Sequence, residues 1–140
     1  MDVEINYLAV LLASIVQFVI GAIWYMPIFG NLWGKIHGFE KLEKTVQKEM
    51  QNNMMPMLVV QFVLNFILAT VLAHFIDQVD QSWYKIAIWV WSGFVVTTQA
   101  SSVIFGATPK KWQLKKVLVM AGASLVEILA AAWIISLFLG

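Results

Sequence analysis

The sequence contains no cysteine and no arginine, and only 12% of its 140 residues are charged. Because cysteine is absent, the chain forms no disulfide and offers no thiolate as a nucleophile or metal ligand. Because arginine is absent and the net charge is only +1, we expect no nucleic-acid partner. The charged share is about half of the ~25% typical of soluble domains, which argues against a soluble protein.

Hydrophobic residues make up 61% of the chain and gather in four long stretches. These stretches cover residues 7–26, 57–76, 86–105 and 117–139. Each is near the ~20 residues with which a helix crosses a hydrocarbon core, whereas strands of a membrane barrel are shorter and alternate in polarity. The sequence therefore predicts one domain over residues 1–140, an all-α integral membrane bundle of four transmembrane helices.

The connection between the first two stretches has a helical pattern of its own. Apolar residues recur there at spacings of three and four: Ile36, Phe39, Leu42, Val46 and Met50. Charged residues cover the other sides, which predicts a cytoplasmic amphipathic helix over residues 36–50 with these five side chains buried. We expect Pro27 to end the first helix, and Thr108 to cap a last helix that begins at Pro109.

Lysines are distributed unevenly between the two ends of such a bundle. Eight of the nine lie in the first and third connections: Lys35, Lys41, Lys44, Lys48, Lys110, Lys111, Lys115 and Lys116. The opposite face carries Lys85 and the acidic residues Asp2, Glu4, Asp77 and Asp80. The positive-inside rule then places the basic face in the cytoplasm and both termini outside. Because the start of the chain is acidic rather than basic, we expect the first stretch to be retained as a helix and not cleaved as a signal peptide.

Glu127 is the one charged residue inside the four apolar stretches, eleven residues into the last. An ionised carboxylate is costly in hydrocarbon, so we expect Glu127 to face protein or water and to be neutral at rest. Two interpretations remain open. Glu127 is either a protonatable binding or transport group, or a carboxyl that holds the helices together through hydrogen bonds.

Amide side chains on the other three helices lie at depths that overlap that of Glu127. They are Gln17, Gln61, Asn65 and Gln99. Small residues share their helical faces, as Gly21 does with Gln17, which is typical of helices that pack closely and bond across the interface. A polar cavity open to the inner half of the membrane is the alternative. We expect Glu127 to contact at least one of Gln17, Asn65 or Gln99.

Two further groups of residues have more than one interpretation. Trp24 and Trp33 are either interfacial anchors or, together with Gln99, the walls of a ligand pocket. The lysines of the third connection bind an anionic lipid headgroup or only set the topology; they are Lys110, Lys111, Lys115 and Lys116. The two histidines, His37 and His74, lie far apart in the sequence, so we expect no metal site and no cofactor.

Two motifs in the first part of the chain carry a family resemblance. They are Asn6-Tyr7-Leu8-Ala9-Val10 and the segment from Gly21 through Trp24-Tyr25-Met26-Pro27 to Gly30, followed by Trp33. With the step from Phe105 to Pro109, they make the chain resemble the small bacterial membrane proteins of domain-of-unknown-function family 1761. The resemblance covers essentially the whole chain. It implies a four-helix fold and a bacterial cytoplasmic membrane location, and it implies no activity.

Two function classes follow. The first is a transporter- or channel-like bundle with Glu127 in a polar core; four short helices rarely enclose a solute path, so a homo-oligomer in the lipid bilayer is expected. The alternative is a structural or accessory membrane protein whose polar core only specifies packing. An enzyme is not expected, because no catalytic constellation is visible.

Overall fold

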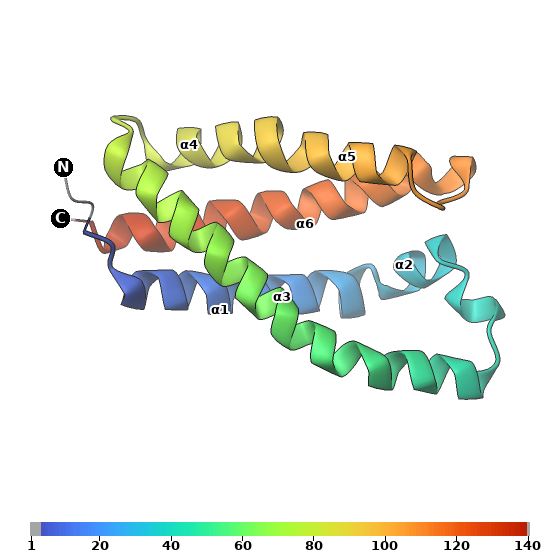
Figure 1. Ribbon diagram of the computed structural model, residues 1–140. Helices are drawn as coiled ribbons and strands as arrows, with labels where there is room; N and C mark the ends of the chain where they lie inside the picture. Colours follow the sequence, from blue (N-terminus) through green and yellow to red (C-terminus); the bar gives the residue numbers. More distant parts are fainter. Residues whose placement is uncertain (1–3, 140) are drawn as a thin grey trace.

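The computed structural model describes residues 4–139, so Asp2, assigned above to the acidic face, lies outside the described part. Within that part the chain forms helices and no strand, and four helical segments are long and apolar enough to cross a membrane. They cover residues 7–28, 44–78, 83–104 and 110–137 (Figure 1). This confirms the prediction of an all-α fold with four candidate membrane helices.

The first span does not end at Pro27 as expected. Helix α1, Tyr7–Ile23, is capped by Asn6 and continues into a π-helical turn, Trp24–Ile28, which contains the proline. The turn is wider than an α turn, because the backbone N–H of Phe29 donates to Trp24 O at 2.9 Å, five residues back. Pro27, which has no backbone N–H to donate, lies within this turn. Helix α2, Gly30–Ile36, follows directly.

The predicted amphipathic helix over residues 36–50 is not a separate element. Its first residues end α2 and form a short 3₁₀ turn, Phe39–Lys41, and the remainder begins helix α3, Lys44–Gln78. Only Ile36 of the five apolar residues is buried, and Phe39 is half-buried. Leu42, Val46 and Met50 are exposed.

Helix α3 runs through Pro56 without a break and is 35 residues long. At 1.5 Å per residue it measures about 52 Å, well beyond a hydrocarbon core of ~30 Å. The span predicted over residues 57–76 is therefore only the second part of this helix, which begins at Lys44.

The third span consists of α4, Trp83–Val90, a π-helical turn, Trp91–Val96, and α5, Thr97–Ile104. Helix α6, Lys110–Leu137, forms the fourth. Pro109, and not Thr108, occupies the cap position, and the Thr108 hydroxyl accepts a hydrogen bond from Lys116 Nζ at 3.1 Å instead. The lysines assigned to the third connection therefore lie on the first two turns of a helix.

Helix α1 packs most extensively against α6 and next against α3, which crosses the bundle diagonally (Figure 1). Both termini lie at one end, while α2 and the turn before α6 lie at the other. The hydrophobic core is concentrated near the termini, where early residues of α1 meet late residues of α3 and α6; its largest fully buried members include Val10, Leu72 and Ile128.

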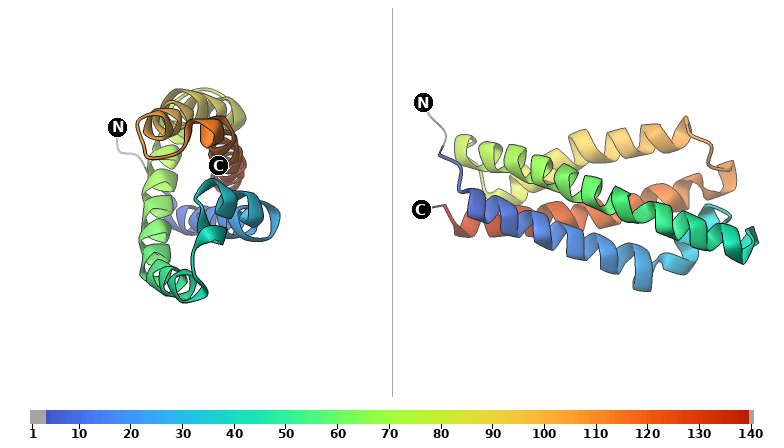
Figure 2. Two further views of the ribbon diagram at one scale, coloured as in Figure 1. Left: turned by 90° about the vertical axis from the view of Figure 1, so that its right-hand side faces the viewer. Right: turned by 60° about the horizontal axis from the view of Figure 1, so that its bottom comes forward.

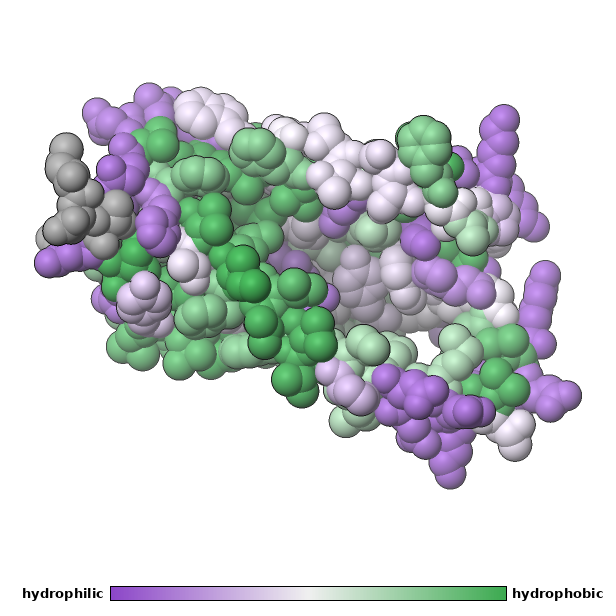
Figure 3. All heavy atoms as spheres, in the orientation of Figure 1, coloured by the Kyte–Doolittle hydropathy of each residue, from purple (hydrophilic) through white to green (hydrophobic). Residues whose placement is uncertain are grey.

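Towards the basic end the helices separate. In the end-on view of Figure 2, the turn before α6 and the start of α3 lie on opposite sides, with α2 between them. Figure 3 shows a broad apolar surface over the second part of α3, hydrophilic atoms at both ends, and a hollow with pale and hydrophilic atoms between the start of α3 and α5. The bundle is therefore closed at one end and open at the other.

Candidate functional site: a membrane-embedded carboxyl and its surroundings

Glu127 lies in the middle of α6 and faces α1. Its Oε1 atom is 2.9 Å from the position that a Cβ atom on Gly21 would occupy, so the missing side chain of Gly21 provides the room for the carboxyl. Glu127 is half-buried. Among residues 4–139 it has no hydrogen bond to Gln17, Asn65 or Gln99, and no ion pair.

The accessibility of this carboxyl follows from a second observation. Within the described residues, every fully buried side-chain nitrogen or oxygen has a hydrogen-bond partner. The oxygens of Glu127 have no such partner, so they are not fully buried. A carboxyl at this depth that is accessible and unbonded can accept a proton or bind a cation.

The amides of α1 and α3 form a separate cluster. Gln17 is fully buried, and its Nε2 donates to the backbone oxygen of Asn65 at 3.5 Å. Gln61 Nε2 donates to Asn65 Oδ1 at 3.0 Å, one turn along the same helix. Gln17 and Asn65 therefore lie at the same level, and the bond from Gln17 joins α1 to α3.

Gln99 belongs to a third polar group, between α5 and α6. The hydroxyl of Ser124 is 3.4 Å from Gln99 Oε1 and 3.0 Å from the backbone oxygen of Ala121. The sequence placed Gln99 at the depth of the other amides, but the fold places it on a different helix interface. The hydrogen bonds thus divide the amides between two helix interfaces, α1 with α3 and α5 with α6, and include Glu127 in neither.

Two tryptophans attach to α6 through its backbone. Trp24 Nε1 donates to Val119 O at 3.0 Å, and Trp91 Nε1 donates to Ala121 O at 2.9 Å. The Trp24 ring covers Gly122, where a Cβ atom would come within 2.7 Å of it. The sequence analysis did not single out Trp91. Its position inside a span could have done so, because an indole N–H in the middle of a span needs a hydrogen-bond acceptor within the protein.

The sequence suggested that Trp24 and Trp33 could be walls of one pocket, but their rings pack against different aromatic residues. The ring of Trp24 packs on Phe29, with centroids 5.0 Å apart. The ring of Trp33 packs on Tyr25 and on His37, at 4.8 and 4.4 Å. Trp33 thereby fixes α2 against the end of the first span.

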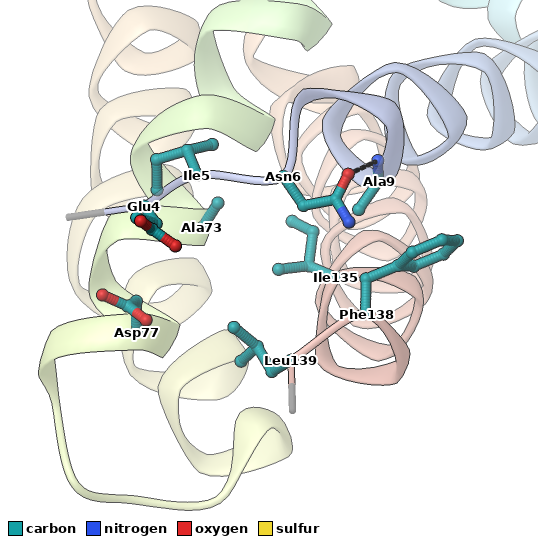
Figure 4. Close-up of a pocket in the computed structure, with 9 residues that line it drawn as sticks. All are labelled: Glu4, Ile5, Asn6, Ala9, Ala73, Asp77, Ile135, Phe138 and Leu139. Atoms are coloured by element: carbon teal, nitrogen blue, oxygen red, sulfur yellow. Dashed lines mark hydrogen bonds between the residues drawn. The ribbon is translucent and has the colours of Figure 1, made fainter.

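Each end of the bundle has a pocket. The pocket near the termini has a volume of about 420 Å³ and is lined by Glu4, Asn6, Asp77 and apolar residues; Figure 4 shows the Glu4 and Asp77 carboxyls on the same side of it. Asn6 Oδ1 is occupied there as the cap of α1. Neither this pocket nor the basic one is lined by Glu127.

The pocket at the basic end has a volume of about 500 Å³ and lies between the residues after α2 and the start of α6. Lys111 and Lys116 line it, together with Lys35 and Lys41. Two other lysines singled out in the sequence, Lys110 and Lys115, lie outside its lining. In the described part of the chain, no three His, Asp or Glu side chains come close enough to hold a metal.

The chain matches a family of known proteins over most of its length. Residues 8–136 fit the family described as "Protein of unknown function (DUF1761)", which is the family that the motifs of the first span indicated. Neither a curated protein nor a solved structure matches the chain. Since the match covers nearly the whole sequence, the chain belongs to this family.

Proposed function

We propose that the protein is a transporter- or channel-like membrane bundle in which Glu127 is the protonatable binding group. One observation carries the proposal: the carboxyl lies in the middle of a membrane span, against Gly21, and has neither a hydrogen bond nor an ion pair among the described residues. A carboxylate at this depth is stable only with a bound cation, with water or as the neutral acid. A carboxyl that can change between the charged and the neutral form is suited to binding and releasing a proton or a cation.

The shape of the protomer supports a path that is completed by a second copy of the chain. One protomer closes only at the end with the termini, and its surface is hollowed between the start of α3 and α5 (Figure 3). Four helices alone enclose no continuous path, so we propose a homo-oligomer in which a neighbouring protomer supplies the remaining wall. The bound species is a proton or a small cation, since a carboxylate attracts either.

A specific observation favours the second candidate, a structural or accessory membrane protein. The amide cluster of Gln17, Asn65 and Gln61 is occupied by one hydrogen bond from α1 to α3 and one within α3. Trp24 and Trp91 likewise use their N–H groups on α6. Such bonds hold helices together without binding anything else. The two candidates differ in what they require of Glu127.

Proton flux into vesicles separates them. The protein is reconstituted into liposomes that contain a pH-sensitive dye, and an inside-negative potassium diffusion potential is applied. We expect proton uptake faster than in protein-free liposomes, and we expect Glu127→Gln to abolish the difference while preserving assembly. Asp77→Asn, which removes an exposed carboxyl next to the last residue of α3, is the matched control and should behave like the parent. Equal uptake by the parent and Glu127→Gln would reject the proposed function and favour the structural role.

We further propose that the protein lies in the bacterial cytoplasmic membrane with both termini outside. The eight lysines at one end support this orientation through the positive-inside rule. The chain has no cysteine, so single cysteines introduced at Ser82 and at Lys44 report the two faces. In intact cells, an impermeant maleimide should label the cysteine at position 82 and not the one at 44. Labelling in the opposite pattern would reverse the orientation.

A further inference from the structure

The basic pocket brings together residues from two segments that are distant in the sequence. Residues 35–41 supply Lys35 and Lys41, and residues 107–116 supply Lys111 and Lys116. In the end-on view of Figure 2, α2 and the turn before α6 lie next to each other at this end. The pocket therefore depends on the fold, and the sequence cluster of four lysines predicted only two of its members.

The charge of the pocket is unbalanced. Four lysines and His37 line it, and no acidic residue does. Among residues 4–139 these lysines form no ion pair with a carboxylate, although Glu40 and Glu43 are close in the sequence. Like charges gathered in a concave site repel one another, and a concave site concentrates their field on an incoming anion. The pocket is consequently suited to an anion that neutralises several ammonium groups at once.

Aromatic rings and a hydroxyl orient the ammonium groups. Lys116 Nζ donates to Thr108 Oγ1 at 3.1 Å and lies 5.7 Å from the centroid of the Trp33 ring. Lys111 Nζ lies 5.9 Å from the centroid of the Trp112 ring. Cation–π contacts of this length hold a flexible side chain without neutralising its charge. Two of the four ammonium groups are thus positioned in advance of binding.

The pocket lies where a membrane presents phosphate groups. It is at the end of the spans, beside Trp33 and Trp112, and tryptophans favour the headgroup level of a bilayer. A lysine ammonium binds phosphate as a point charge, without the planar geometry that arginine requires. A volume of about 500 Å³ accommodates a phosphate group with its substituent. We infer that this pocket binds a phosphate-bearing anion, either an anionic phospholipid headgroup or a soluble phosphate ester.

Titrations of the purified protein in a neutral detergent test the inference and distinguish the two sources. One arm adds dioctanoyl phosphatidylglycerol, with zwitterionic dioctanoyl phosphatidylcholine as its control. The other adds inorganic phosphate or glycerol 3-phosphate at constant ionic strength. Tryptophan fluorescence follows binding, since Trp33 and Trp112 contact the pocket lysines. Saturable binding of phosphatidylglycerol alone identifies a lipid site, and saturable binding of the free phosphates identifies a soluble ligand.

Two double variants with the same change in net charge separate the pocket from general attraction. Lys35→Gln with Lys111→Gln removes two lining lysines, and Lys110→Gln with Lys115→Gln removes two lysines outside the lining. The pairs are matched, because Lys111 and Lys115 both lie over the Trp112 ring. Lys35 and Lys111 are exposed, so neither is needed for the fold.

We expect affinity to fall about tenfold or more in the pocket variant and less than about twofold in the control. Equal losses in both variants would overturn the inference, because they would indicate attraction by the whole basic surface. The absence of saturable binding to either kind of probe would overturn it as well. The outcome is independent of Glu127, which lies outside this pocket.

Discussion

Helix α1 packs against α6 and α3 through two polar interfaces of different kinds. Towards α3, Gln17 is buried and bonded to the backbone of Asn65, which also accepts from Gln61. Towards α6, Gly21 makes room for the Glu127 carboxyl, and Gly122 lies under the Trp24 ring, whose N–H donates to Val119 O. The polar groups on the α3 side are occupied by each other, whereas the carboxyl on the α6 side is not. The difference shows that burial depth alone does not reveal whether a polar residue serves packing or binding.

The largest effect is expected from Gly122→Ala, on the α6 side. The added Cβ atom would lie 2.7 Å from the Trp24 ring, which the hydrogen bond to Val119 keeps in place. We expect the free energy of unfolding to fall by about 1–3 kcal/mol, as for overpacking in a core. Unfolding in mixed micelles, followed by circular dichroism, measures this loss.

Gly93→Ala is the matched control, because nothing lies within 4 Å of the Cβ atom it would add. It should leave stability unchanged or raise it by up to about 1 kcal/mol, since alanine is the better helix former. Similar losses in both glycine variants would mean that helix α6 does not depend on the close approach of Trp24.

A smaller effect should distinguish the two interfaces directly. Gln17→Leu removes the donor of the bond from α1 to the backbone oxygen of Asn65 in α3, and we expect it to cost about 0.6–1.7 kcal/mol. Glu127→Gln keeps the shape of the side chain and breaks no described hydrogen bond, so it should change the free energy of unfolding by less than about 0.5 kcal/mol. The same unfolding assay measures both. A loss on replacing Glu127 as large as that for Gln17 would place the carboxyl among the structural bonds.

The sequence was a reliable guide to features that depend on local hydrophobicity. Four apolar stretches gave four helical spans, and the motifs of the first span indicated the family that residues 8–136 match. Depth along a helix was also predictable, because each residue adds a fixed rise. For that reason Gln17 and Asn65 were placed at the same level, where they do meet.

Features that depend on neighbouring helices were not predictable from one chain. The stripe over residues 36–50 indicated a separate helix, but the fold joins its second part to α3 and leaves Val46 and Met50 exposed. Depth did not reveal which helix faces which, so Gln99 was grouped with amides that the fold keeps apart from it. Lys35 and Lys41 line the basic pocket because the start of α6 lies beside α2, and the sequence alone does not show this proximity.

The π-helical turns that begin at Trp24 and Trp91 have a consequence for how the two spans present their surfaces. A π turn contains about one residue more than an α turn, so every residue after it is rotated by roughly 100° from its place on an uninterrupted helix. A single helical wheel therefore cannot describe either span. In the third span, α4 and α5 lie on one axis but differ in phase, and the extra residue at the turn sets which side of α5 faces α6. Deleting one residue between Trp91 and Val96 would keep the length of the span almost unchanged while turning Gln99 away from Ser124.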